Sequence, residues 1–107
     1  MRSRDVLLAG AIALQISISS GPTQEIGVPS RGLALALRLC SECHAAERQR
    51  GGAPNESAPQ FATIAATPGM TAMALSAALN TPHRSMPNVM LQADEQADII
   101  AYILTLR

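Results

Sequence analysis

The only two cysteines of this chain lie three positions apart and are followed at once by a histidine, in the stretch CSECH at positions 40–44. A chain of 107 residues has room for one small domain with a modest hydrophobic core. Phe61 and Tyr102 are its only aromatic residues, and it contains no tryptophan. The core must therefore consist of Leu, Ile, Ala and Met side chains, or form around a group that is not polypeptide.

Residues 1–20 have the plan of a secretory signal peptide. Arg2 and Arg4 precede an apolar run from Val6 to about Ile18, and small residues follow it. The run falls short of the ~20 apolar residues that a membrane-spanning helix needs, so we expect cleavage, at an undetermined site, rather than a retained anchor. The mature protein is then periplasmic and soluble, in a compartment where a close thiol pair forms a disulfide unless it serves another purpose.

A linker at residues 21–30 is predicted to lead into one all-α domain at residues 31–107. The leucines at alternate positions from 33 to 39 have the period of a strand, but this stretch contains no β-branched residue. Leucine and alanine are strong helix formers. We therefore expect a helix that begins near a Ser30 cap and runs into CSECH.

The rest of the domain has weaker but readable signals. Residues 51–60 are rich in glycine and proline and are predicted to form a loop. Thr71 is expected to cap a short helix that ends at Asn80, because a Thr-Pro pair follows. Another helix is predicted over residues 93–106, with one broad apolar face and with acidic residues in its first turn that match the helix dipole.

The CSECH stretch carries the Cys-x-x-Cys-His signature of c-type haem attachment. Two thiols on about one helical turn can each form a thioether with a vinyl group of the porphyrin, and the adjacent imidazole then lies under the iron. Three other interpretations compete: a thioredoxin-like redox pair, which would need a βαβ context; a zinc site, which would need two further ligands; and a structural disulfide. The export signal and the histidine directly after Cys43 favour one haem c, covalently bound through Cys40 and Cys43.

With this motif, the chain resembles the cytochrome c family, specifically the small soluble monohaem cytochromes of bacterial export compartments. The resemblance extends over residues 30–107 and rests on CSECH, on Met86-Pro87 and on Ala101-Tyr102-Ile103. It implies a fold of three or more helices wrapped around one covalently attached haem. It also implies that Gly32 is the small residue at which the first and last helices cross closely, near Ile99 and Tyr102.

The resemblance makes His44 the proximal axial ligand of the haem iron and Met86 the distal one. A methionine thioether is a soft ligand suited to haem iron, and together with histidine it raises the reduction potential. The proline after Met86 fixes an extended loop in which the side chain can be aimed. Met90 and His83 are alternatives for the sixth position, and His83 would give a bis-histidine site of lower potential.

Two further positions depend on the same comparison. A backbone carbonyl should accept the other imidazole proton, which fixes the tautomer and the ring plane. Pro54 resembles the family's loop proline for this role, and Pro59 is the alternative. Met70 and Met73 are expected to pack in the haem pocket rather than to bind the iron.

The charged residues exclude one class of partner. All eight basic residues are arginines, the formal net charge is zero and no basic run is present, so electrostatics gives no argument for nucleic-acid binding. The lysine ring with which many cytochromes c dock on acidic partners is missing. We expect a monomer that meets its redox partner proteins through an apolar or mildly polar surface around an exposed haem edge, with weak salt dependence.

The predicted function is outer-sphere electron transfer by a carrier that is not itself an enzyme, because two filled axial positions keep substrates from the iron. The alternative is a haem-bearing subunit or an open-site haem protein in which the sixth ligand is displaceable. Thiol–disulfide exchange by Cys40 and Cys43 is a third interpretation, which requires that no haem is attached.

Overall fold

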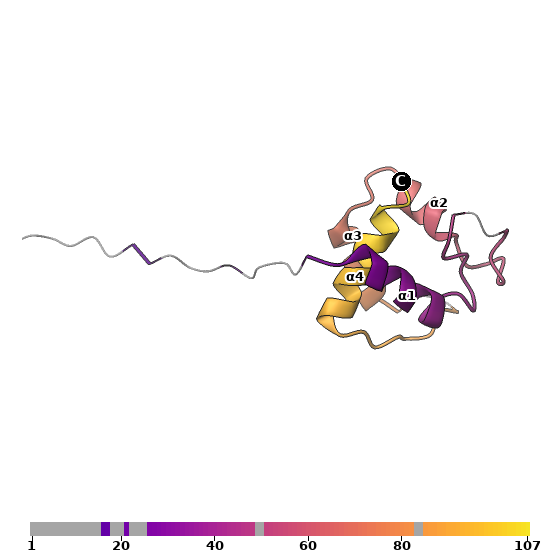
Figure 1. Cartoon of the computed structure of the whole chain (residues 1–107), viewed down its shortest axis with the longest axis horizontal. Helices are drawn as coiled ribbons and strands as arrows, with labels where there is room; N and C mark the ends of the chain where they lie inside the picture. The colour runs from indigo at the N-terminus through magenta and orange to yellow at the C-terminus, as the bar shows by residue number, and fades with distance from the viewer. Residues whose placement is uncertain (1–15, 18–20, 22–25, 49–50, 83–84) are drawn as a thin grey trace, which may run out of the picture.

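The computed structural model describes residues 16–17, 21, 26–48, 51–82 and 85–107, and the predicted signal peptide lies almost wholly outside them. Within these ranges the chain forms four α-helices and no strand (Figure 1). They are α1 (Pro29–Leu39), α2 (Phe61–Ala66), α3 (Ala72–Asn80) and α4 (Ala93–Leu104). The prediction of an all-α protein is confirmed for the described part of the chain. None of these four helices has both the length and the apolar character that a transmembrane helix requires.

Helix α4 is the centre of the fold. Each of the other three helices packs against it, and α1, α2 and α3 make no helix–helix contact with one another. Helix α4 therefore holds in place both α3 and α1, the helix after which CSECH follows. The buried hydrophobic side chains come from all four helices and from the segment after CSECH: Leu35, Ala36, Ala45, Ala46, Phe61, Ala65, Leu75, Ile99, Ile100, Tyr102 and Ile103.

The start of α1 depends on a contact with α4. The helix begins at Pro29, and no side chain caps it locally, so the prediction of a Ser30 cap is wrong. Proline suits the first helical position because it has no N–H to satisfy and its φ is already helical. The buried Asp98 carboxylate accepts a 2.6 Å hydrogen bond from the N–H of Val28 and lies 2.8 Å from Nε of Arg31. The last residues of the predicted linker thus belong to α1 and its cap.

Gly32 lies where α1 crosses α4, and this close crossing was predicted. A Cβ atom at position 32 would stand 1.9 Å from the carbonyl oxygen of Asp98 and 2.8 Å from Cβ of Tyr102. The segment before α1 is equally close to α4, because a Cβ atom on Gly27 would stand 1.9 Å from the carbonyl oxygen of Ala97. Only residues without a side chain allow the two backbones to approach so closely.

Local signals set the limits of α3 and α4. Thr71 Oγ1 accepts a 3.1 Å hydrogen bond from the N–H of Ala74, so the predicted cap of α3 is confirmed. At the start of α4, the Glu95 side chain accepts a 3.0 Å hydrogen bond from the N–H of Gln92. The end of α4 comes two residues before the predicted one, at Leu104, because the N–H groups of the next two residues bond to carbonyls only three positions back.

Helix α2 was not predicted. It has six residues, and its N-terminus has no side-chain cap. The N–H of Phe61 instead donates a 3.1 Å hydrogen bond to the carbonyl of Ala45, and the side chains of Phe61 and Ala65 are buried in the core. Such a short helix is stabilised by tertiary packing rather than by its own propensity.

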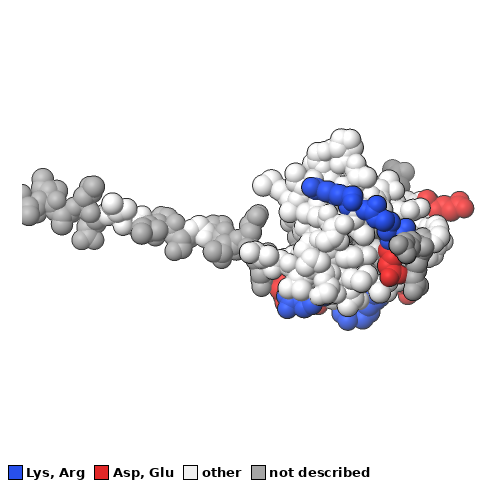
Figure 2. Space-filling model, turned by 45° about the horizontal axis from the view of Figure 1, so that its top comes forward, with Lys and Arg blue, Asp and Glu red and all other residues white. Residues whose placement is uncertain are grey.

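Helices α2 and α3 have no charged residue of their own, although the Arg107 side chain reaches the segment between them and donates a 2.5 Å hydrogen bond to the carbonyl of Met70. No charged residue stands between Ser57 and Pro82, the part of the chain that contains both helices. Most of the face seen in Figure 2 is white, and arginine and acidic side chains lie at its lower margin and in a band across it. Among the described residues from the start of α1 onward, the two most exposed large apolar side chains are Met73 on α3, at 74%, and Met90, at 85%.

Candidate cofactor-binding site

The CSECH stretch forms one closed backbone turn directly after α1. The N–H groups of His44 and Cys43 both bond to the carbonyl of Cys40, at 2.9 Å and 3.2 Å. This turn follows from the position of Cys40, whose own N–H still bonds to the carbonyl of Ala36 at 2.9 Å and so continues α1. The two sulfur-bearing residues and the imidazole are therefore presented together at the end of a rigid helix.

Both cysteines are free thiols, and both are half-buried. Cys40 packs against the hydrophobic core. Burial raises the pKa of the Cys40 thiol above its ordinary value. A cysteine that attacks disulfides needs a lowered pKa instead, since the thiolate is the nucleophile. The environment of Cys40 therefore does not favour thiol–disulfide exchange.

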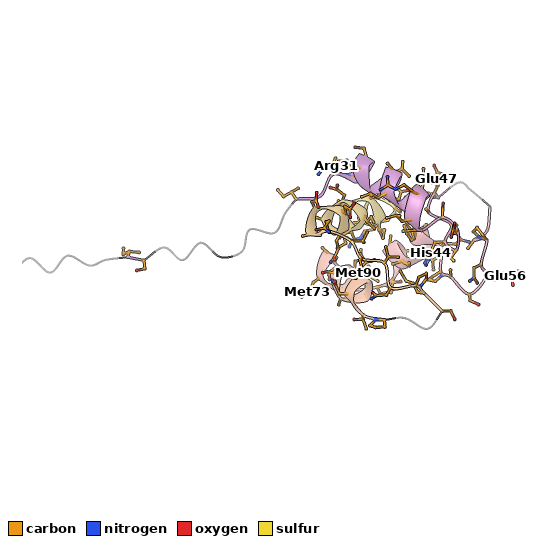
Figure 3. The ribbon with its side chains drawn as sticks, turned by 90° about the horizontal axis from the view of Figure 1, so that it is seen from below. Arg31, His44, Glu47, Glu56, Met73 and Met90 are labelled. Carbon is orange, nitrogen blue, oxygen red and sulfur yellow. The ribbon has the colours of Figure 1, made fainter. Side chains whose placement is uncertain are left out.

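The imidazole of His44 is oriented by a backbone carbonyl. Its Nδ1 atom lies 2.7 Å from the carbonyl oxygen of Pro59. A carbonyl can only accept, so Nδ1 must carry the proton, and Nε2 is left with a free lone pair for a metal. The ring also lies 5.3 Å from the ring of Phe61, tilted by 49°. Figure 3 shows His44 and Met73 on different sides of the domain, with Met90 between them in this view.

The carbonyl that faces His44 belongs to Pro59 and not to Pro54, which was the preferred prediction. The reason lies in the peptide after Pro54, where the N–H of Asn55 donates a 3.2 Å hydrogen bond to the carbonyl of Cys43. In a trans peptide the C=O and N–H groups point in opposite directions. The carbonyl of Pro54 is therefore turned away from CSECH, and Pro59, further along the loop, takes the role.

The segment after His44 is held by α4 and α2. Tyr102, in the last turn of α4, donates a 2.6 Å hydrogen bond from its hydroxyl to the carbonyl of Ala46. Arg48 donates to the carbonyls of Leu106 and Arg107, the latter at 2.9 Å. Together with the bond between Phe61 and Ala45, these contacts fix the backbone that carries His44. The positioning roles of Phe61 and Arg48 were missed, although a lone phenylalanine in an aromatic-poor chain was a usable signal.

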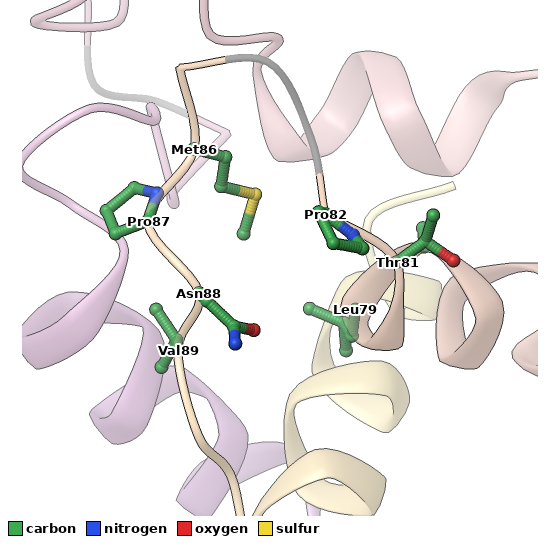
Figure 4. Close-up of a pocket in the computed structure, with 8 residues that line it drawn as sticks. Leu79, Thr81, Pro82, Met86, Pro87, Asn88 and Val89 are labelled. Carbon is green, nitrogen blue, oxygen red and sulfur yellow. The ribbon is translucent and has the colours of Figure 1, made fainter.

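Met86 lies in a groove between the end of α3 and the segment 85–89. The groove is lined by residues that include Leu79, Pro82 and Val89. The Met86 side chain is half-buried and points across the groove toward Leu79 and Pro82 (Figure 4). The structure brings Cys40, Cys43 and His44 together in one turn, and no residue of CSECH lines the groove that holds Met86.

The other sulfur and imidazole candidates differ from Met86 in their surroundings. Met90 is exposed and lines a hollow that continues the groove toward Gln96 on α4. Met70 packs against the core, whereas Met73 is exposed, and their packing against a haem stays a prediction. His83 lies outside the described residues.

A conventional metal centre is not formed by the residues that the structure describes, because they contain no group of three or more His, Cys, Asp or Glu that could hold an ion. The zinc interpretation therefore gains no further ligands within these residues. Comparisons with protein families, with curated proteins and with solved structures give no match to this chain. A function is accordingly inferred from the residues of the site.

Proposed function

We propose that this chain binds one haem covalently through Cys40 and Cys43 and transfers single electrons between redox partner proteins in the periplasm. The observation that carries the proposal is the geometry of CSECH. One closed turn presents two thiols, and Pro59 holds Nδ1 of His44 so that Nε2 is the free ligand atom. An imidazole whose second nitrogen is fixed in this way is typical of metal-binding histidines.

The residues around the motif fit a large apolar group. The buried core of the described residues holds two aromatic side chains, Phe61 and Tyr102, and is otherwise aliphatic. Three helices contact α4 without contacting each other, so little helix–helix packing joins the motif to α3. A flat macrocycle would supply apolar surface that these side chains do not, and it would give a haem-wrapped fold of the cytochrome c type.

The roles of the chain's own residues follow from this proposal. Cys40 and Cys43 would hold the cofactor by thioethers, His44 would be the proximal axial ligand through Nε2, and Met86 would be the distal ligand. A bound haem supplies an iron that gains and loses one electron. The Met86 thioether would raise the reduction potential, and the filled axial positions would keep substrates out, as expected of a carrier rather than an enzyme.

Two observations bear on the competing functions. The raised pKa of the Cys40 thiol argues against a thiol–disulfide exchange protein. The open-site alternative, in which the sixth ligand is displaceable, is distinguished by how firmly Met86 is held. Met86 is half-buried in its groove, whereas Met90 is 85% exposed, which favours Met86 as a lasting ligand.

The composition of α2 and α3 supports an apolar mode of partner recognition. The chain has no charged residue from Ser57 to Pro82, and the exposed side chains of Met73, on α3, and Met90, beside the groove, add apolar surface. A small uncharged patch gives brief encounters, which suit a carrier that must leave after each transfer. The protein would act as a monomer, and its encounters would depend weakly on salt.

Mass spectrometry of the mature protein, expressed in the periplasm of cells with an active haem-attachment system, tests the proposal. We expect the polypeptide mass plus one haem, retained after acid–acetone extraction. A polypeptide that carries only a Cys40–Cys43 disulfide under these conditions contradicts it.

A further inference from the structure

Both aromatic side chains of this chain contact the short segment 44–46, which begins with His44. The chain has one phenylalanine, one tyrosine and no tryptophan. The Phe61 ring lies 5.3 Å from the imidazole of His44, and the Tyr102 hydroxyl bonds to the carbonyl of Ala46. The segment carries the proposed proximal ligand, so the two rigid rings of the chain lie where that ligand has to be held.

The Phe61 ring is itself fixed in place. Its side chain is 4% exposed and belongs to the hydrophobic core. Its backbone N–H donates a 3.1 Å hydrogen bond to the carbonyl of Ala45, the residue next to His44. Phe61 is also the first residue of α2, which packs against α4. A ring packed in this way has little freedom to move, so it limits the positions that the neighbouring imidazole can take.

The imidazole of His44 is therefore restrained at two different places. The carbonyl of Pro59 faces Nδ1 at 2.7 Å, and the Phe61 ring lies beside the imidazole with a tilt of 49°. The separation of the two rings falls in the range of about 4.5–7 Å that aromatic pairs favour. A hydrogen bond at Nδ1 fixes the tautomer but still lets the imidazole swing about this one contact. The Phe61 ring limits that swing.

We propose that Phe61 is a positioning residue that tunes the reduction potential of the haem iron through His44. The Phe61 ring keeps the imidazole aligned with the carbonyl of Pro59, and the hydrogen bond at Nδ1 makes Nε2 more basic. A more basic ligand stabilises the oxidised iron, which has the higher positive charge, so a firm hydrogen bond lowers the potential. The inference rests on the proposed function, because it takes Nε2 of His44 as the proximal ligand atom.

The test compares the reduction potentials of haem-loaded full-length variants. Phe61→Leu keeps an apolar side chain but removes the flat ring, so the imidazole can swing away from the carbonyl of Pro59. We expect a higher potential than in the parent, together with faster exchange of the Nδ1 proton with solvent, measured by NMR in the reduced state. Phe61→Tyr keeps the ring and should keep both values of the parent.

The matched control is Ile99→Val, which shortens another buried side chain of the same core. It should lower the free energy of unfolding and leave the potential and the Nδ1 exchange unchanged. Phe61→Met, with an adaptable apolar side chain, takes the place of Phe61→Leu if the leucine variant does not fold.

The outcomes separate this inference from the proposed function. If the parent carries covalent haem but the variant without the ring keeps the parent's potential or its Nδ1 exchange, Phe61 has no positioning role and the proposed function stands. The inference also fails if Ile99→Val shifts both values as far as Phe61→Leu does, because the change then reflects loss of core packing alone. A parent protein without covalent haem overturns both proposals.

Discussion

The backbone of Gly32 lies directly against the carbonyl group of Asp98, so closely that a Cβ atom at position 32 would stand 1.9 Å from the carbonyl oxygen. That oxygen belongs to the main chain of α4, so it cannot rotate aside as the end of a flexible side chain would. Since α4 is the helix on which α1, α2 and α3 all pack, a change at this crossing affects the centre of the fold.

Gly32→Val should therefore destabilise the protein strongly. Overpacking of a well-packed site typically costs about 1–3 kcal/mol, and we expect at least the upper end because two backbones must separate. Urea denaturation of the haem-loaded protein measures the loss. Gly51→Val is the control, because a Cβ atom there would meet nothing within 4 Å. Equal stabilities of the two variants would mean that the crossing tolerates a side chain.

The acid stability of the fold should depend on Asp98. The hydrogen bond from Arg31 and then that from the N–H of Val28 hold the pKa of this carboxyl below its ordinary value, which is about 3.9. Because the pKa is lower in the folded state, the ionised carboxylate stabilises the fold fully above the unfolded pKa. This contribution is lost as the pH falls through the folded pKa.

Asp98→Asn should accordingly lower the free energy of unfolding at about pH 7 and flatten its decline below about pH 4. Chemical denaturation over a series of pH values provides the measurement. Asp94→Asn, at an exposed position in the first turn of α4, serves as the control and should keep the decline of the parent. An unchanged acid profile for Asp98→Asn would show that the contact with Val28 and Arg31 does not stabilise α1.

Helices with local signals were predictable from the sequence. Thr71 provides a side-chain cap, and the Thr-Pro pair after Asn80 ends α3 where expected. The start of α1 was predicted incorrectly because its partner is distant: the bond between Val28 and Asp98 spans 70 positions. Helix α2 was missed for the same reason, since the N–H of Phe61 bonds to the carbonyl of a residue in another part of the chain.

The candidate site shows the same division between local and distant signals. The spacing of CSECH was sufficient to predict that its two thiols and its imidazole share one turn. The choice between Pro54 and Pro59 was not predictable, because it depends on which way a single peptide plane faces in the 51–60 loop. The exposure of Met73 depends on how α3 rotates on α4, and the sequence of α3 is apolar apart from Ser76 and Asn80.

Folding should depend on cofactor attachment. The double substitution Cys40→Ala and Cys43→Ala removes both proposed thioethers, and a group that binds only the folded state contributes its binding free energy to stability. We expect a largely unfolded or molten polypeptide, seen as the loss of a cooperative melting transition by circular dichroism. Ser41→Ala, within the same turn, should retain the transition. Native-like melting of the haem-free double variant would show that the aliphatic core is sufficient to fold the chain without the cofactor.

Encounters with redox partners should depend weakly on ionic strength. The formal net charge is zero, and the chain has no charged residue from Ser57 to Pro82, the stretch that contains α2 and α3. Electron self-exchange between oxidised and reduced copies, followed by line broadening in NMR spectra, measures this without a known partner. Met73→Glu should slow the exchange and make it faster with added salt, since like charges would then face each other. A strong salt dependence in the parent protein would point to docking on a charged face.

The assignment of Met86 as the distal ligand decides between a carrier and an open-site haem protein. In the oxidised parent we expect the weak near-infrared sulfur-to-iron band of a methionine-ligated haem. Met86→Ala should abolish this band, lower the reduction potential and allow the reduced protein to bind carbon monoxide, because the thioether raises the potential and occupies the sixth position.

Met90→Ala is the matched control for Met86→Ala. Met90 lies four positions further along the same segment, but it is 85% exposed and its sulfur lies beside the side chain of Asn88. Its removal should leave the near-infrared band, the potential and the carbon monoxide reaction close to those of the parent, and His83→Ala should do the same. If Met90→Ala loses the band and Met86→Ala retains it, the distal ligand is Met90 and not Met86. Rapid carbon monoxide binding by the reduced parent would instead mean that the sixth position is open, and the carrier assignment would then give way to the open-site alternative.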